Sequence, residues 1–258
     1  MTEIKFYGRG LSGFQYAELP GKLIVLEGPD GVGRSTQIAL LREWLEASGY
    51  AVSSSGLKRS ELASVGIAEA KEGHTLGTLT MALFYAADLA DRLEHEIIPA
   101  LRAGFVVLTD RYLYSLIARA QVRGVDPGWL RSLMGFALVP DAVYYLRANL
   151  EHLVPRVLGS RGFDFWESGM DFLGRSDYYE SYMEYQRRML ATFEALGKEY
   201  GFRNVDATRS IREVFVELRD GIAEIVSELK PSHVGEMAAF EATRDGEHPA
   251  LRGSFSPS

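Results

Sequence analysis

Short apolar runs alternate with longer segments of helical periodicity along most of the chain. Residues 21–27 are apolar and β-branched, which predicts a buried strand. From Ser35 onward, Ile38, Leu41 and Leu45 recur at helical spacing, and a glycine then stops the pattern. We expect further strands near 50–54, 105–109, 142–146 and 202–205, a loop-rich stretch after 54, and helices over 76–101, 126–138, from 149 onward, 176–196 and 211–229.

This alternation of strands and helices predicts an α/β fold. A central parallel sheet with right-handed crossovers, covered by helices on both faces, is the arrangement that such a pattern favours. The domain is expected to span 21–229. Residues 1–20 read as an N-terminal arm or a small hairpin, and 230–258 are rich in Pro, Gly, Ser and charge, which predicts a disordered tail. Ligands of a parallel sheet bind at the carboxyl ends of its strands.

Composition narrows the function classes. The 258 residues are 47% hydrophobic, which fits one large domain, and the formal charge of −7 gives no general attraction to nucleic acid or anionic membrane. Without cysteine, disulfides and thiolate chemistry are excluded. The sequence shows no signal-peptide pattern at its start and no long apolar run. We expect a cytoplasmic protein with no nucleic-acid or membrane partner.

The segment 28–36, GPDGVGRST, has the spacing of a phosphate-binding loop. It follows a predicted strand and precedes a predicted helix, so a curled backbone and a helix N-terminus can face a polyphosphate. A glycine-rich turn without a ligand is the alternative. The Ser35 hydroxyl is suited to Mg²⁺. The predicted nucleotide contacts are Gly28, Asp30, Gly31, Val32, Gly33, Arg34, Ser35 and Thr36.

Arg34 stands where this motif calls for lysine. Arginine keeps its charge and donates bidentately to phosphate, but it is longer and planar, so it does not occupy the same point between two phosphates. We expect nucleotide binding to survive the exchange. Efficient phosphoryl transfer does not follow from the motif alone.

Five segments appear in the order and at nearly the spacing of one known family. They are EGPDGVGRSTQ (27–37), LFYAAD (83–88), DRY (110–112), PDAVYYL (140–146) and VDATRSI (205–211). Over about residues 21–228 the sequence resembles the thymidylate kinase family. The resemblance implies a three-layer α/β/α P-loop NTPase fold with a mobile lid over about 155–176. It also implies ATP as donor, Mg²⁺ as cofactor, a nucleoside monophosphate as acceptor, and a homodimer.

The resemblance also assigns roles on the acceptor side. Asp30 matches a carboxylate that approaches the sugar hydroxyl, and Phe84 matches an aromatic ring that stacks on the base. Arg111 matches the arginine that orients the acceptor phosphate, and Ser115 follows it in the same motif. A position for Phe84 in the core is the plainer alternative.

The predicted catalytic residues carry positive charge or lie near the metal. Phosphoryl transfer spreads charge over the equatorial oxygens of the transferred group, so positioning and cations supply most of the catalysis. By resemblance, Asp110 lies near the metal with Ser35, while Arg156 and Arg161 belong to the lid. Asp110 as a helix cap, a structural pair with Arg111, and solvated lid arginines are the alternatives. The catalytic set is Arg34, Asp110, Arg111, Arg156 and Arg161.

Besides Arg34, three positions depart from the family pattern: Asp88, Leu116 and Arg119. Asp88 replaces an arginine that grips the acceptor phosphate, and Arg92 follows one helical turn later. Arg92 is predicted either to bind the acceptor or to pair with Asp88 on the helix surface. Leu116 replaces an amide that reads thymine and cannot hydrogen-bond, whereas Arg119 could meet an acceptor phosphate.

Three hypotheses follow. The first is a kinase for dTMP or a related nucleoside monophosphate. The second is a nucleotide-binding module of the same fold that transfers no phosphate, and the third is a kinase for another small phosphorylated acceptor. The segment 166–171, WESGMD, either shapes the acceptor pocket or orders the lid.

Overall fold

The central sheet contains five parallel strands in the order β2-β3-β1-β4-β5. In the computed structural model, which describes residues 6–11, 19–57, 60, 64–72, 77–160 and 162–229, all five predicted strands are confirmed. Leu26 pairs with Asp110, so the end of β1 and the end of β3 lie side by side. The strands are β1 (Lys22–Glu27), β2 (Val52–Gly56), β3 (Val106–Asp110), β4 (Ala142–Arg147) and β5 (Arg203–Asp206).

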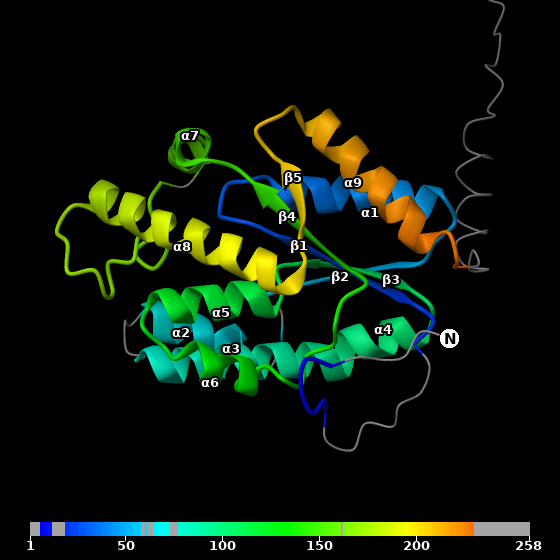
Figure 1. Cartoon of the computed structure of the whole chain (residues 1–258), viewed down its shortest axis with the longest axis horizontal. Helices are drawn as coiled ribbons and strands as arrows, with labels where there is room; N and C mark the ends of the chain where they lie inside the picture. Colours follow the sequence, from blue (N-terminus) through cyan, green and yellow to red (C-terminus); the bar gives the residue numbers. More distant parts are fainter. Residues whose placement is uncertain are drawn as a thin grey trace, which may run out of the picture.

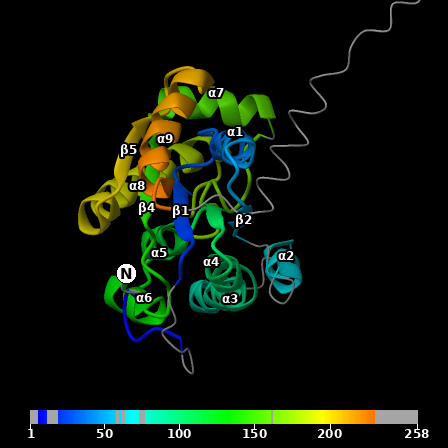
Figure 2. The same ribbon diagram turned by 90° about the vertical axis from the view of Figure 1, so that its right-hand side faces the viewer.

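Helices cover both faces of the sheet, as the predicted three-layer fold requires (Figure 1). One face carries α1 (Arg34–Ala47) and α9 (Ile211–Val226). The other carries α3 (Thr78–Arg92), α4 (Ile98–Arg102), α5 (Leu113–Val122) and α8 (Tyr178–Tyr200). Figure 2 shows the layers from the side, with α2 (Ser64–Glu72) beyond α3 and α7 (Leu150–Ser160) near α1. The short α6 (Pro127–Leu133) precedes β4.

Strand β1 is buried on both of its faces, which explains its uninterrupted apolar run. Leu23 and Val25 belong to the cluster beneath α3, α5 and α8, whereas Ile24 and Leu26 belong to the cluster beneath α1 and α9. A parallel strand between two helical layers has no solvent face, so no polar alternation is expected. The sheet core therefore fixes the loop that follows β1 at the carboxyl edge.

Three element predictions were wrong. Helix α2 lies in the stretch expected to be loop-rich, and α5 directly after the DRY motif was not predicted. The helix predicted over 126–138 ends at Leu133. The chain beyond it is held by the N-terminal arm: Tyr7 N donates to Ala137 O at 3.1 Å and Gly8 N donates to Gly135 O at 2.8 Å. The carbonyl oxygens of Gly135 and Ala137 thus accept hydrogen bonds from the arm instead of from a further turn of α6.

The long helical region predicted over 76–101 contains a π-helical turn. Helix α3 continues into the π segment Leu93–Ile97 and then into α4. The residues buried along this region recur every four positions, and a regular α-helix would drift by about 40° at each such step. The wider π turn absorbs part of this drift. The four-residue series is Met81, Tyr85, Leu89, Leu93, Ile97 and Leu101.

Leu79 and Leu83 correct the predicted apolar face of this helix. We expected both to be buried, but they are 56% and 45% exposed. They lie between the buried positions of the four-residue series and point away from the sheet side. Val65 of α2 is exposed in the same way.

The chain ends are described only in part. Residues 6–11 lie along 135–138, with an isolated antiparallel bridge between Phe6 and Leu138. The predicted hairpin would need 12–18, which fall outside the described residues, as does the predicted tail over 230–258. Within the described ranges, no helix has both the length and the apolar character needed to cross a membrane.

Candidate functional site

The glycine loop joins β1 to α1 and passes close to α7. Gly31 has φ of 78°, and a Cβ atom there would lie 2.9 Å from Cγ2 of Val157. Gly33 has φ of 99° and is the N-cap of α1. Both conformations favour glycine, and a glycine N-cap leaves the first N–H groups of the helix available to an anion. The loop therefore has the backbone that the sequence motif predicted.

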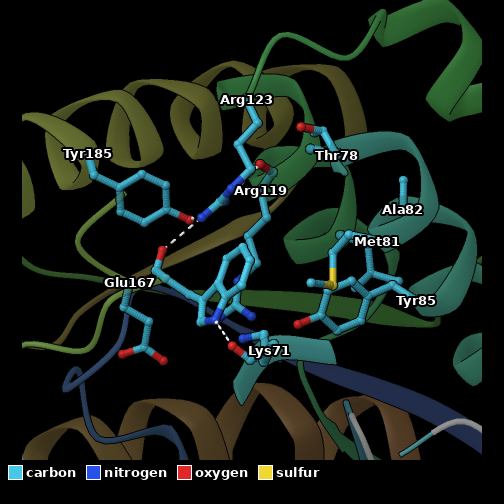
Figure 3. Close-up of a pocket in the computed structure, with 12 residues that line it drawn as sticks. Lys71, Thr78, Met81, Ala82, Tyr85, Arg119, Arg123, Glu167 and Tyr185 are labelled. Carbon is cyan, nitrogen blue, oxygen red and sulfur yellow. Dashed lines mark hydrogen bonds between the residues drawn. The ribbon is translucent and has the colours of Figure 1, made fainter. Parts of the chain in front are cut away.

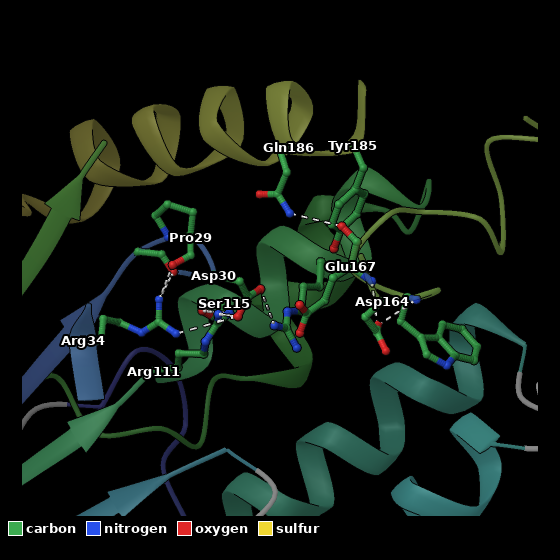
Figure 4. Close-up of polar contacts among 12 residues, drawn as sticks. Pro29, Asp30, Arg34, Arg111, Ser115, Asp164, Glu167, Tyr185 and Gln186 are labelled. Atoms are coloured by element: carbon green, nitrogen blue, oxygen red, sulfur yellow. Dashed lines mark hydrogen bonds and ion pairs between the residues drawn. The ribbon is translucent and has the colours of Figure 1, made fainter. Parts of the chain in front are cut away.

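Arg34 is folded back against its own loop (Figure 4). Its Nε donates to Asp110 Oδ1 at 2.7 Å, and its Nη1 donates to the carbonyl oxygens of Gly28 and Pro29, both at 2.5 Å. The side chain is buried. Arg34 thus links the loop to the end of β3 through protein oxygens. Its Nη2 takes part in none of these bonds and lies 3.9 Å from Asp30 Oδ1, and its contact with donor phosphates stays a prediction.

Asp110 joins Arg34 to Ser35. The Ser35 hydroxyl donates to Asp110 Oδ2 at 3.1 Å. Burial by itself would raise the pKa of Asp110, but the charges of Arg34 and Arg111 and the two hydrogen bonds lower it overall. Asp110 is therefore an anion at neutral pH. A serine hydroxyl beside an ionised carboxylate, both at the loop, is a donor set suited to Mg²⁺.

Asp30 draws three arginines together. Its Oδ1 accepts a hydrogen bond from Arg111 and lies 3.9 Å from Nη2 of Arg34, while its Oδ2 lies 3.4 Å from Nη2 of Arg119. These four residues line a cavity of about 180 Å³ with Asp110. An incoming phosphate would compete with Asp30 for the same guanidinium groups, because charge-assisted bonds to phosphate and to carboxylate have similar geometry.

Arg111 adopts a left-handed backbone conformation, with φ of 72°. Its N–H donates to Leu26 O at 3.0 Å, which aligns the turn after β3 with β1. Burial and the nearby charges of Arg34 and Arg119 lower its pKa, whereas Asp30 acts in the opposite direction. A non-glycine residue at positive φ costs about 1–3 kcal/mol and is found chiefly at functional sites.

Glu27 holds this turn and was not singled out from the sequence. Its carboxylate accepts hydrogen bonds from the backbone N–H groups of Tyr112 and Ser115 and, at 2.6 Å, from the Ser115 hydroxyl. It thereby caps α5 from the end of β1. Burial raises the pKa of Glu27. Ser115, predicted to bind the acceptor, is fully buried and bonded to Glu27. The sequence did offer one sign of this role, because a carboxylate stands at the end of an otherwise apolar strand.

A second, mostly apolar pocket adjoins the arginine-lined cavity described above (Figure 3). Helix α3 contributes Met81 and Tyr85, and α5 contributes Leu116 and Arg119. Arg119 and Glu167 line both cavities, so the two cavities adjoin each other. Burial disfavours the charge on Arg119, but Asp30 raises its pKa and keeps it cationic.

Phe84 and Arg92 lie away from this pocket. A Cβ atom on Gly66 of α2 would come within 3.0 Å of Cε1 of Phe84, so the ring packs against α2. Arg92 is fully buried, with Nε donating to Asp88 Oδ2 at 3.1 Å and Nη1 donating to Ser55 Oγ at 3.2 Å. The suggested pairing of Asp88 with Arg92 on the helix surface was wrong in its location, because the pair is inside the protein.

Arg123 fixes the segment WESGMD and was also missed from the sequence. Its Nε donates to Asp171 Oδ2 at 2.7 Å, and its Nη2 donates to Trp166 O at 2.7 Å. Trp166 and Glu167 line the apolar pocket. Arg123 therefore holds the segment at both ends, and the first two residues of the segment shape the pocket. The aromatic and acidic residues of the segment drew attention to it in the sequence, but no local pattern indicated that it contacts Arg123.

The lid prediction rests on two arginines, of which the structure describes one. Arg156 is exposed on α7, and its Nη1 lies 3.3 Å from Ala207 O in the loop after β5. That loop belongs to the segment VDATRSI (205–211) of the family pattern. Arg161 lies outside the described residues. The catalytic roles of both arginines and the mobility of the lid stay predictions.

The strand order, the glycine loop at the end of β1 and the arginine-lined cavity beside it define a P-loop nucleotide kinase. The family model of thymidylate kinase matches residues 26–218. The chain is 35% identical over 208 residues to the probable thymidylate kinase 2 of Saccharolobus solfataricus, covering 80% of this chain and 97% of that protein. It is 37% identical over 213 residues to the thymidylate kinase of Leifsonia xyli, covering 78% and 93%. The chain belongs to the thymidylate kinase family.

Proposed function

We propose that the protein transfers the γ-phosphoryl group of ATP to dTMP or a closely related deoxynucleoside monophosphate. The observation that carries the proposal is that the two cavities adjoin and share Arg119 and Glu167 as lining residues. A nucleoside monophosphate has a charged end and a planar, mostly apolar end. Its phosphate fits the cavity lined by Arg111 and Arg119, and its base fits the pocket between α3 and α5.

The donor would lie over the glycine loop. The N–H groups at the start of α1 and the loop backbone would bind its phosphates. Arg156, which reaches Ala207 from α7, lies where it could contact the nucleotide. Ser35 and Asp110 would hold Mg²⁺, which supplies positive charge to the donor phosphates when bound.

The residues on the acceptor side orient the attacking oxygen. An oxygen of the acceptor phosphate attacks the γ-phosphorus, the bond to the bridging oxygen breaks, and ADP leaves. Arg111 and Arg119, drawn together by Asp30, would offset the repulsion between donor and acceptor phosphates. No covalent intermediate on the protein is needed, so catalysis consists of positioning and electrostatic stabilisation.

A homodimer in the cytoplasm is part of the same proposal. Val65, Leu79 and Leu83 place exposed aliphatic side chains on α2 and α3, which supports an apolar contact between subunits. Light scattering of the purified protein tests the assembly. A monomer mass at micromolar concentration would remove the dimer from the proposal without affecting the kinase activity.

The experiment is acceptor-dependent ADP release from ATP and Mg²⁺, measured with dTMP and with the other nucleoside monophosphates. We expect turnover with dTMP and a loss of at least about 100-fold in Asp110→Ala. Asp126→Ala, which removes only the carboxylate that caps α6, is the matched control and should keep full activity. ATP binding without turnover on any acceptor would favour the binding module, and turnover on another acceptor alone would replace dTMP.

A further inference from the structure

Tyr85 carries a buried hydroxyl without a partner. The residue is 5% exposed, and among the residues that the structure describes its Oη has no hydrogen-bond partner. Burying a hydroxyl without a bond is unfavourable, so such atoms are rare in folded proteins. An unpartnered hydroxyl at the edge of a cavity indicates a bond made only when a ligand is present.

The hydroxyl is directed into the pocket proposed to receive the acceptor base. Figure 3 shows it pointing from α3 toward the centre of the pocket, near Lys71. Helix α5 forms the adjoining wall with Leu116, which cannot hydrogen-bond. Tyr85 therefore offers a hydrogen-bonding capacity that Leu116, on the adjoining wall, does not.

Other polar groups of this pocket are engaged with the protein. Arg123 donates to Asp171, to the Tyr185 hydroxyl and to Trp166 O, and the indole N–H of Trp166 donates to Lys71 O at 3.0 Å. Arg119 bonds to Asp30. These bonds shape the pocket. Of the described residues that line it, Tyr85 is the one with a fully buried side-chain oxygen that has no hydrogen-bond partner.

We propose that Tyr85 is a specificity-determining residue whose hydroxyl donates a hydrogen bond to a carbonyl oxygen of a pyrimidine base in the acceptor. The proposal rests on the proposed function, because it requires the acceptor base to occupy this pocket. A site built to pair a polar group on its substrate discriminates strongly, since the wrong ligand leaves the group unpaired. Tyr85 would thus read the base from α3.

Tyr85→Phe tests the proposal, because it removes the hydroxyl and keeps the ring. The affinity for dTMP and for thymidine, measured by calorimetry, should fall about 10- to 100-fold. The affinity for deoxyribose 5-phosphate, which has no base, should not change. The melting temperature without nucleotide should stay the same or rise, since an unpartnered buried hydroxyl is lost.

Tyr145→Phe is the matched control. Tyr145 of β4 is also buried with an unpartnered Oη among the described residues, and its ring stacks on Phe193, but it does not line this pocket. It should affect the melting temperature in the same direction and leave dTMP affinity unchanged.

Three results would overturn the proposal. Unchanged dTMP affinity in Tyr85→Phe, or an equal loss in Tyr145→Phe, would show that the hydroxyl does not read the base. A lower melting temperature in Tyr85→Phe would show that it has a partner in the protein. Turnover of dTMP by the unmodified protein is measured in parallel, so a failed kinase function is recognised separately from a failed role of Tyr85.

Discussion

Arg34 donates from Nε to Oδ1 of Asp110 at 2.7 Å, so the cation of the glycine loop is tied to the carboxylate that ends β3. The same guanidinium binds two carbonyl oxygens of its own loop. A lysine ammonium is a compact point charge and has no planar fork that spans a carboxylate and two carbonyls in this way. The arginine therefore stabilises the loop in addition to any role in phosphate binding.

Replacement of Arg34 should lower stability. Arg34→Ala removes charge-assisted bonds from a partly buried carboxylate and two carbonyls, and we expect the free energy of unfolding to fall by about 2–3 kcal/mol. Arg34→Lys should lose less, because it keeps the charge. Urea unfolding at pH 7 measures both. Arg42→Ala, which breaks an exposed pair with Glu46 on the same helix, should change it by less than about 0.5 kcal/mol. Equal effects of the two alanine variants would contradict the stabilising role of Arg34.

The lowered pKa of Asp110 should affect how the free energy of unfolding falls at acidic pH. A carboxyl whose pKa is lower in the folded than in the unfolded state contributes stability above its ordinary pKa, near 3.8. That contribution is lost as the pH falls through the folded pKa, below about 4. Unfolding measured from pH 7 to pH 3 should therefore show a shallower decline in Asp110→Asn than in the unmodified protein. Parallel curves would contradict this assignment.

Much of the fold followed from the sequence because strands and helices leave different periodicities. The five strands, the glycine loop and the helix after it needed only local patterns. Exposure of Leu79 and Leu83 could not be predicted in that way, because periodicity shows which residues share a face and does not show what that face contacts. The end of α6 depended on the N-terminal arm, which is remote in sequence.

The candidate site was predictable where a motif fixes the backbone. Asp30, Arg34, Asp110 and Arg111 lie together as expected. The pairings that complete the site join distant parts of the chain, such as Arg123 with Asp171 and Glu27 with α5, and no local spacing encodes them.

Arg92 should prove to be a structural residue. Both Arg92 and Asp88 are fully buried, and removing one partner of a buried pair leaves an uncompensated charge. Arg92→Met or Asp88→Leu alone should lower the free energy of unfolding by about 3–5 kcal/mol, whereas the double variant should recover most of the loss. Urea unfolding of the four proteins measures this. A stable Arg92→Met protein with weakened acceptor binding would instead support the acceptor-binding prediction.

Gly31 and Gly33 provide a comparison within one loop. Alanine at either site must adopt a left-handed conformation, at about 1–2 kcal/mol. At Gly31 the new methyl group would also press on Val157 of α7, whereas nothing lies within 4 Å at Gly33. We expect Gly31→Ala to be the less stable of the two by urea unfolding. Equal stability would show that α7 moves aside freely.

The π turn at Leu93–Ile97 makes the long helix tolerant of a change of one residue in its length. A wide turn within a helix is equivalent to one added residue, so deleting a single residue there would restore regular α-helical winding and keep both flanking halves against the sheet. A deletion anywhere else in α3 would instead rotate the pocket residues away from α5. This turn is therefore the position in the long helix where an evolving sequence can gain or lose one residue while the pocket between α3 and α5 keeps its shape.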